Sequence, residues 1–142
     1  MNSTAPPCEF CHSAGGVVLW QNESCRVVRV EDPDYPGFCR VILARHAREM
    51  TDLEPGERDA LMAVVFAIEK VVRETMRPDK MNLASLGNMT PHVHWHVIPR
   101  FRDDRHFPTP IWAAAQREGA VPPERAARAE GLAAALAREL GA

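Results

Sequence analysis

The sequence has no apolar run of about 18 or more residues, so it predicts no membrane-spanning helix. Its N-terminal stretch MNSTAPPCEF lacks the basic and then apolar segments of a secretory signal. Charge of one sign is not in excess either, because 17 Lys and Arg residues are interspersed with 19 Asp and Glu residues and the net charge is −2. We therefore expect a soluble, cytoplasmic protein with no membrane or nucleic-acid partner, in which any anionic ligand is bound by a local site.

The chain has no internal repeat, and its 142 residues predict one domain with a core of its own. Residues 1–7 are polar and contain prolines, so we expect a disordered leader there. Residues 8–112 carry the strand and helix patterns and are expected to form the main domain. The Ala-rich end of the chain, which includes PPERAARAEGLAAALAREL, predicts a C-terminal helical extension over 113–142.

Five short segments have the composition of β-strands, and they are 15–20, 24–30, 38–46, 80–88 and 92–98. Between the third and the fourth, apolar residues recur at steps of three and four from 55 to 76, which is the pattern of an amphipathic helix. Pro55 near the start of this segment and Pro78 beyond its end are typical start and stop signals of a helix. Because most turns are short and only one connection is long, the sequence predicts an α+β fold, an antiparallel sheet of about five strands with one long helix packed on it.

The stretch PHVHWHVIPR, residues 91–100, places His92, His94 and His96 at alternate positions. A strand has a period of two, so the three imidazoles share one face and the intervening apolar residues suit burial against the helix. Neutral imidazole serves as a metal ligand, or as a nucleophile and proton carrier, near neutral pH. The pattern therefore indicates either a metal site or covalent catalysis.

The run H-V-H-W-H-V-I-P resembles the signature of the histidine triad (HIT) superfamily, in which three histidines alternate with apolar residues. The match is complete over 92–98 and extends more loosely over residues 8 to about 101, including the C-x-x-C start. The resemblance implies a HIT-like fold and a nucleotide hydrolase or nucleotidyl transferase. Its substrate would be a dinucleoside polyphosphate or a nucleoside phosphoramidate. The resemblance also implies a homodimer whose sheets join into one, and no organic cofactor.

In the family that this chain resembles, the middle histidine attacks the α-phosphorus and becomes a nucleotidyl-histidine, which water then cleaves. Carried over, His94 is the nucleophile, and His96 binds phosphate oxygens and helps to protonate the leaving group. A nitrogen nucleophile attacks an anionic phosphate only if neighbouring donors offset the charge on the phosphate oxygens. The attacking nitrogen must be unprotonated, so we expect an acceptor that holds the N–H on the other side of the ring.

Cys8 and Cys11 form a C-x-x-C pair, which in a reducing compartment is more often a metal or redox site than a structural disulfide. The resemblance supplies His46 and His92 as the two further ligands of a tetrahedral Cys2His2 zinc site. Four protein ligands leave no position for water, so such a zinc ion would be structural. The alternative is two reduced thiols, with His92 merely hydrogen-bonded near the active site.

The family that this chain resembles carries a Gly-Gln-Ser/Thr-Val stretch before the triad, whereas this chain reads L-G-N-M-T-P. Asn88 and Thr90 are the expected substitutes, because an amide and a hydroxyl both donate to phosphate oxygens. Asn82 matches an asparagine of similar proteins and is a third candidate for nucleotide binding, although a structural hydrogen bond explains it equally well. Arg100 and Arg102 are expected to be solvated charges or contacts to a polyphosphate.

Two other classes of function stay open. A nucleotide-binding regulatory module would keep the fold with little turnover. A hydrolase with a metal held by all three histidines is disfavoured, because alternate positions on one strand span about 13 Å from first to last. Trp112 would cover a base or pack at a dimer contact.

Overall fold

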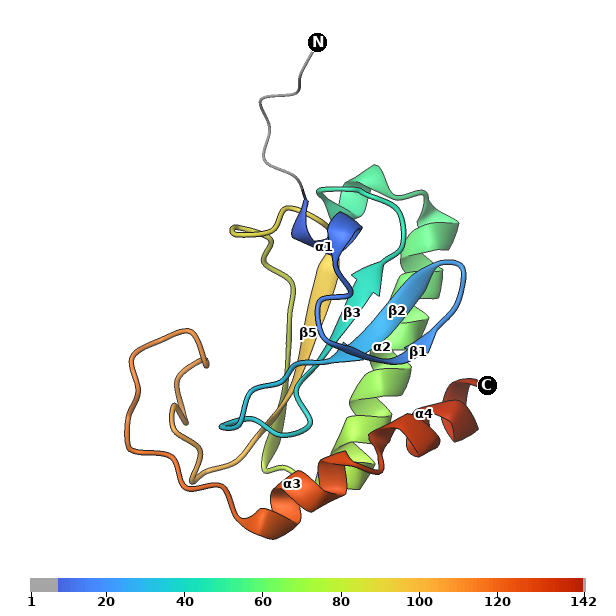
Figure 1. The fold of residues 1–142 in the computed structure, drawn as a ribbon. Helices are drawn as coiled ribbons and strands as arrows, with labels where there is room; N and C mark the ends of the chain where they lie inside the picture. The colour runs from blue at the N-terminus through green and yellow to red at the C-terminus, as the bar shows by residue number, and fades with distance from the viewer. Residues whose placement is uncertain (1–7, 142) are drawn as a thin grey trace.

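The computed structural model describes residues 8–141, which form an α+β fold around one antiparallel sheet (Figure 1). The predicted leader over residues 1–7 lies outside the described residues. The strands, in the order β1-β2-β3-β5-β4 across the sheet, are β1 Val17–Gln21, β2 Cys25–Arg29, β3 Cys39–Leu43, β5 His94–Arg100 and β4 Lys80–Ala84. The predicted antiparallel sheet is confirmed.

The ladder between β3 and β5 fixes what faces the histidines. Both strands are central and rich in apolar residues, which suits burial on both faces. In this ladder Arg40 lies opposite His96, and Ile42 lies opposite His94. On the other side of β5, Ala84 lies opposite His96. The histidine face of β5 is therefore continuous with Arg40 and Ile42.

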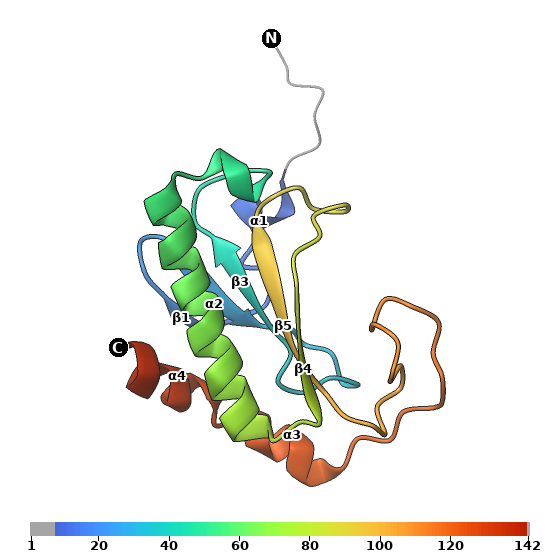
Figure 2. The ribbon, with the colours of Figure 1, turned by 180° about the vertical axis from the view of Figure 1, so that it is seen from behind.

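The long helix α2 (Pro55–Met76) lies across one face of the sheet (Figure 2). A short 3₁₀ turn (Met50–Asp52) precedes it. The helix begins at a proline inside a reciprocal capping box and ends where Arg77 takes a left-handed backbone conformation just before Pro78. The predicted helix is confirmed at both ends.

The apolar stripe of α2 packs on the face of β5 that carries no histidine. Its buried side chains are Leu61, Val64, Val65, Ile68, Val71, Val72 and Met76. They share one core with Val93, Trp95 and Val97. The alternation in the sequence therefore separates a structural face from a chemical face, as predicted.

A short helix, α1 (Glu9–His12), lies against the opposite face near one end of β5 and β3 (Figure 1). The sequence pattern did not predict this helix, because one turn is too short to show a period. Its Phe10 is buried in a small cluster with Val28 and Ile42. The segment that contains the C-x-x-C pair is therefore folded against the sheet.

The connection between β4 and β5 is longer than predicted. β4 ends at Ala84 instead of 88, and β5 begins at His94 instead of 92. Pro91 has no N–H to give to a ladder, and the His92 N–H donates to the Thr90 carbonyl at 2.8 Å in a turn. His92 thus lies outside the strand, so its ring is not held in the row of the other two histidines.

The C-terminal extension forms two helices instead of one, α3 (Pro123–Ala129) and α4 (Leu132–Leu140). Leu132 and Leu136 are fully buried in the main core. The Trp20 indole of β1 donates to the Gly141 carbonyl at 2.8 Å. The extension therefore packs on its own domain, beside α2 and the edge strand β1. No helix among residues 8–141 is both long and apolar enough to cross a membrane.

Candidate functional site

Cys8, Cys11, His46 and His92 converge at the N-terminal end of β5. Their ligand atoms all lie within 4.8 Å of one another. The Cys8 Sγ and the His46 Nδ1 lie 3.3 and 3.4 Å from the His92 Nδ1, and the Cys11 Sγ lies 3.5 Å from the His46 Nδ1. The four predicted metal ligands are thus brought together from α1, the segment after β3, and the turn before β5.

These distances fit a tetrahedral metal ion. Zinc bonds of about 2.0–2.3 Å to nitrogen and sulfur give tetrahedral edges of roughly 3.3–3.8 Å. The His92 Nε2–H donates to the Leu43 carbonyl at 2.7 Å, which leaves its Nδ1 unprotonated and directed at the two thiols. The group can therefore hold a metal ion, with all four positions filled by protein.

Phe10 connects this metal-ligand cluster to the catalytic candidate. It lies between Cys8 and Cys11 in the sequence, and its ring packs edge-on against His94 with centroids 4.8 Å apart. Any displacement of α1 from the sheet moves Phe10 away from His94. The cluster can therefore influence the position of His94 without lining the pocket beside it.

His94 is held in one tautomer. Its Nδ1–H donates to the His92 carbonyl at 2.6 Å, so Nε2 is the unprotonated nitrogen. Burial lowers the pKa of His94 below its usual value, and the positive charge of Arg40 lowers it further, against the hydrogen bond to the His92 carbonyl. His94 is 5% exposed. The acceptor expected from the chemistry is therefore a main-chain carbonyl.

His96 stands next to His94 on the same face, with ring centroids 4.9 Å apart. Burial, and then the positive charges of His94 and Arg40, lower the pKa of His96 to about 4. Its Nδ1 is buried with no hydrogen-bond partner among the described residues. His96 is therefore a neutral imidazole at pH 7 with unused hydrogen-bonding capacity.

A pocket of about 320 Å³ opens over His94 and His96. This volume is at the lower end of the range for small-molecule sites. The residues that line it are Glu9, Phe10, Arg40, Leu86, Gly87, Asn88, Met89, Thr90, His94, His96 and Trp112. The pocket is therefore formed by α1, by the central strands β3 and β5, by the β4–β5 connection and by the segment that carries Trp112.

Two of the three predicted nucleotide-binding residues lie in this pocket, and one does not. Asn88 and Thr90 line it, and the Thr90 hydroxyl donates to the Glu9 carboxylate at 3.1 Å. Asn82 lies outside the lining, and its side-chain oxygen accepts a hydrogen bond from Arg100 at 2.8 Å. Its observed contact is therefore a structural hydrogen bond, which is the alternative to nucleotide binding that the sequence left open.

The expectation for Arg100 was wrong. Arg100 is only 2% exposed and forms a doubly hydrogen-bonded ion pair with Asp104, at 2.8 and 3.1 Å. Asp104 also accepts hydrogen bonds from backbone N–H groups on both sides of it in the turn after β5, including those of Phe101 and Phe107. The pair is a structural link between β5 and the 101–122 segment. Arg102, in contrast, is exposed as predicted.

The sequence patterns missed three polar or aromatic contributors to the pocket, namely Glu9, Phe10 and Arg40. Arg40 is a charge within an otherwise apolar strand, and this signal could have identified it. Trp112 packs edge-on against His96 with centroids 4.9 Å apart, so within this chain it covers the histidine face. Its side chain is still 50% exposed.

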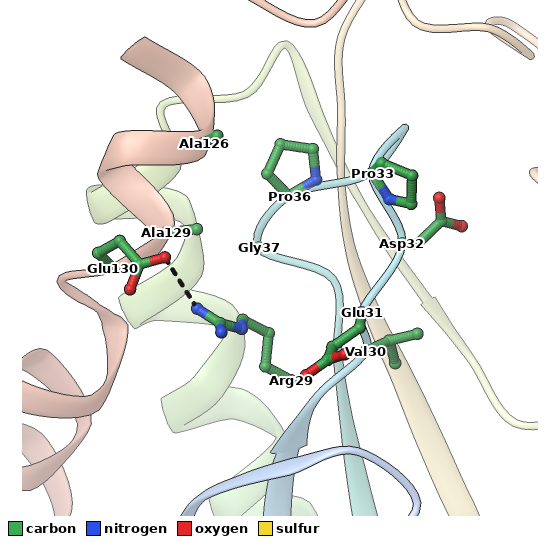
Figure 3. A pocket seen from close by; sticks show the side chains of 10 residues that line it. All are labelled: Arg29, Val30, Glu31, Asp32, Pro33, Pro36, Gly37, Ala126, Ala129 and Glu130. Carbon is green, nitrogen blue, oxygen red and sulfur yellow. Dashed lines mark hydrogen bonds and ion pairs between the residues drawn. The ribbon is translucent and has the colours of Figure 1, made fainter. Parts of the chain in front are cut away.

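A second hollow, of about 300 Å³, lies between α3 and the β2–β3 connection (Figure 3). An ion pair between Arg29 and Glu130, 3.5 Å long, crosses its rim. Its lining is Arg29, Val30, Glu31, Asp32, Pro33, Pro36, Gly37, Ala126, Ala129 and Glu130. It contains neither a histidine nor a cysteine, so it lacks the residue types on which the predicted chemistry depends.

Comparison with known proteins gives two groups of relatives. Over 85 residues the chain is 32% identical to an AP-4-A phosphorylase from Mycobacterium tuberculosis, which covers 56% of this chain and 44% of that protein. Over 77 residues it is 31% identical to an asymmetrical bis(5'-nucleosyl)-tetraphosphatase from Schizosaccharomyces pombe, with coverage of 51% and 42%. The chain spans less than half the length of these curated relatives.

Among solved structures, a histidine triad protein from Bradyrhizobium japonicum has a TM-score of 0.74 at 26% identity, over 94% of this chain and 99% of its own. A zinc-bound histidine triad family protein from Mycobacterium smegmatis has a TM-score of 0.63 at 25% identity, over 92% and 94%. The predicted HIT-like fold is confirmed by these structures. The family model of the HIT domain matches residues 13–103, which include all three histidines of the triad but begin after both candidate cysteine ligands. This chain belongs to the HIT domain family.

Proposed function

We propose that this protein is a nucleotidyl hydrolase or transferase that cleaves at the α-phosphate of a dinucleoside polyphosphate or a nucleoside phosphoramidate. The observation that carries the proposal is the His94 ring, whose Nδ1–H is held by the His92 carbonyl while Nε2 is free beside a pocket. Family relatives named for AP-4-A and for bis(5'-nucleosyl) tetraphosphate support the substrate class.

In the proposed reaction, the lone pair of His94 Nε2 forms a bond to the α-phosphorus as the bond from phosphorus to the leaving oxygen or nitrogen breaks. The positive charge that develops on the imidazole is stabilised by the hydrogen bond from Nδ1–H to the His92 carbonyl. Water, or inorganic phosphate in a phosphorolytic variant, then displaces His94 from phosphorus. A nucleotide is released and the ring returns to its neutral form.

His96 is proposed to bind the phosphate oxygens and to help deliver a proton to the leaving group. Because its pKa is about 4, the ring is neutral at pH 7 and donates one N–H as a hydrogen bond to a phosphate oxygen, and a proton for the leaving group comes from solvent and is relayed through its two ring nitrogens. Its buried Nδ1 has no partner among the described residues. Asn88 and Thr90 lie in the same pocket and supply an amide and a hydroxyl to the phosphate or the ribose. Asn82 is proposed only to support Arg100.

The metal in the Cys2His2 group is proposed to be zinc with a structural role. Two thiolates and two imidazoles are its preferred ligands, and the zinc-bound relative from Mycobacterium smegmatis supports the assignment. When bound, the ion would cross-link α1 to the start of β5. A reducing compartment such as the cytoplasm would keep both thiols available.

A homodimer is proposed to form along β4. The opposite edge strand, β1, contacts α4, and its Trp20 indole donates to the Gly141 carbonyl, while Val17 and Val18 on it are 38% and 43% exposed. The outer edge of β4 has no strand partner among residues 8–141, and Leu83 on this strand is 37% exposed. Pairing of two β4 edges would join the two sheets into one and satisfy the free main-chain groups.

The test is turnover of a panel of diadenosine polyphosphates and adenosine phosphoramidates, with and without inorganic phosphate. Wild type should release a nucleotide from at least one compound, and His94→Ala should be slower by at least about 1,000-fold. His12→Ala is the matched control, because His12 is an exposed histidine outside the pocket lining. Tight nucleotide binding with no product from any compound would favour the regulatory module over the hydrolase.

A further inference from the structure

Arg40 is a charged side chain at the second position of β3, a strand whose other members are apolar. It lies directly opposite His96 in the β3–β5 ladder. Directly opposite residues on one face of an antiparallel pair have Cβ atoms about 4.5–5.5 Å apart. Arg40 also lines the pocket over His94 and His96. Its guanidinium group is therefore part of the same surface as the two imidazoles.

Two phenylalanine rings hold the Arg40 guanidinium in place. Its central carbon lies 5.6 Å from the ring centroid of Phe10 and 5.9 Å from that of Phe38. Phe10 in turn packs on His94, and Phe38 packs on His96 with centroids 5.7 Å apart. Stacking between aromatic faces restricts the guanidinium without using its N–H groups. The cation is thus positioned beside both histidines with its donors still available.

The donors of Arg40 are largely unused. Its Nη1 donates to the Gly15 carbonyl at 2.9 Å, whereas its Nε is buried with no partner among the described residues. Glu9 shares the pocket, but its carboxylate accepts the Thr90 hydroxyl and no ion pair with Arg40 is formed. A buried donor without an acceptor costs free energy, so this arrangement is unfavourable unless a ligand completes it.

Two other arginines of the sheet, one buried and one half-buried, use more of their donors within the protein. Arg100 donates to the Asp104 carboxylate, to the Asn82 amide and to the Thr109 carbonyl. Arg26, on the neighbouring strand β2, donates to three main-chain carbonyls of the N-terminal segment. Arg40 differs from both in having one protein partner and a cavity in front of it.

We propose that Arg40 is a phosphate-binding residue, whose guanidinium receives the non-bridging oxygens of the α-phosphate that His94 attacks. This inference rests on the proposed function. Arg40 would offset the charge on those oxygens while the His94 Nε2–phosphorus bond forms and the bond to the leaving group breaks, and it would stay protonated throughout. It would thereby add a charged donor to the Asn88 amide and the Thr90 hydroxyl of the L-G-N-M-T-P turn.

The experiment is isothermal titration calorimetry of the metal-loaded protein with the four ribonucleoside monophosphates and their parent nucleosides. Wild type should bind at least one monophosphate more tightly than its nucleoside. Arg40→Met, which keeps an unbranched side chain without the charge, should bind that monophosphate about 10- to 100-fold more weakly and the nucleoside unchanged. Arg40→Lys should fall in between, because a lysine keeps the charge but not the fork of donors.

The matched control is Arg102→Met, which removes the same charge from an exposed arginine outside the pocket lining and should bind like wild type. Metal content and melting temperature should be equal in all four proteins. If Arg40 only holds Gly15 and α1 in place, Arg40→Met will lose metal, or will lose affinity for nucleoside and monophosphate alike. Either result overturns the assignment.

If Arg40→Met does not fold, a nuclear magnetic resonance signal of the wild-type protein provides a second test. The Arg40 Nε–H resonance, identified by its loss in Arg40→Lys, should shift on addition of the monophosphate and not of the nucleoside. Equal monophosphate affinity in wild type and Arg40→Met, or an unmoved Nε–H resonance, overturns the role of Arg40 but not the proposed function. If wild type binds and cleaves no nucleotide, the proposed function fails together with it.

Discussion

At the scale of single residues, the roles of His92 and His94 are separated by which ring nitrogen is bonded to the main chain. His92 gives its Nε2–H to the Leu43 carbonyl and presents Nδ1 to the cysteines. His94 gives its Nδ1–H to the His92 carbonyl and presents Nε2 to the pocket. The same residue type, two positions apart, is thereby suited to metal binding in one case and to nucleophilic attack in the other.

The protonation of His94 predicts the shape of the pH profile. Because burial lowers the pKa of His94 below its usual value of 6.5, and Arg40 adds to the effect, the ring is neutral and nucleophilic at pH 7. We expect kcat/KM for nucleotide cleavage to be flat from pH 7 to 8 and to fall only below pH 6.5, as His94 takes up a proton.

The control for this profile is the metal content at each pH, since acid also protonates the ligands of the Cys2His2 group. An acid limb with its midpoint at or above pH 6.5, in protein that retains its metal, would contradict the lowered pKa. The neighbouring His96 does not complicate this range, because its pKa is about 4.

At the scale of secondary-structure elements, α1 is attached to the sheet by the metal-ligand cluster and by Phe10. The helix has four residues, too few to be stable alone. Its contacts place Phe10 against His94 and also against the Arg40 guanidinium. The attachment of α1 is therefore expected to set the geometry of the reacting face.

Removal of the metal should consequently lower activity without removing any reacting group. We expect Cys8→Ser/Cys11→Ser to lose bound zinc, measured by inductively coupled plasma mass spectrometry, and to lose at least about 10-fold in kcat. Cys25→Ala is the matched control, because Cys25 is buried in the main core and should leave the metal content at the wild-type level. Full kcat in the double variant, with no zinc bound, would rule out a role for the cluster in positioning His94.

The Arg100–Asp104 ion pair connects β5 to the segment that carries Trp112. Burial alone would raise the pKa of Asp104, but hydrogen bonds from Arg100 and from three backbone N–H groups lower it to about 2. Because this value lies below the unfolded value of about 3.9, the carboxylate stabilises the fold above pH 4, by about 2 kcal/mol, and that contribution is lost as the pH falls toward 2.

Asp104→Asn leaves Arg100 buried without its counter-charge, so we expect the free energy of unfolding in urea to drop by about 3 kcal/mol at pH 7. Asp103→Asn is the matched control at the neighbouring position. Its carboxylate is 60% exposed and pairs with Arg125 at the surface, so the loss should stay below about 1 kcal/mol. Equal losses in the two variants would show that the buried pair adds nothing specific to the fold.

At the scale of the whole molecule, the two edges of the sheet differ. β1 contacts α4 and donates from the Trp20 indole to the Gly141 carbonyl, whereas β4 has no strand beyond it among residues 8–141 and Leu83 on it is 37% exposed. We predict a dimer by light scattering, and Leu83→Lys should shift it toward the monomer, since a lysine on an edge strand opposes pairing. Val18→Lys, on the other edge strand β1, is the control, because Val18 is 43% exposed and so comparable to Leu83, and it should leave the mass unchanged. A wild-type protein that is monomeric at micromolar concentration would contradict the dimer.

The sequence predicted the parts of the fold that repeat over several residues. The period of α2 and the alternation of β5 are such signals: α2 has the predicted bounds, and β5 overlaps its predicted range but is shifted by two residues to His94–Arg100. Three features depend on tertiary contacts and on local turns, so no periodic pattern in the sequence predicts them. They are the single turn of α1, the division of the C-terminal extension into α3 and α4, and the start of β5 at His94.

The candidate site was predictable where chemistry restricts the residue type, and less so elsewhere. The four candidate metal ligands lie within 4.8 Å of one another, and His94 and His96 line one pocket. Arg40 and Phe10 were missed because their relevance depends on the strand register and on the docking of α1. Arg100 was assigned to solvent because its partner, Asp104, lies in an irregular turn with no pattern of its own.

The most direct test of this account is intact-protein mass spectrometry after a millisecond quench without acid, which preserves a phosphorus–nitrogen bond. With a dinucleoside polyphosphate that wild type cleaves, the account predicts a mass increase of one nucleotidyl group in wild type and none in His94→Ala. The same adduct in His94→Ala, or undiminished turnover by that variant, would show that His94 is not the nucleophile.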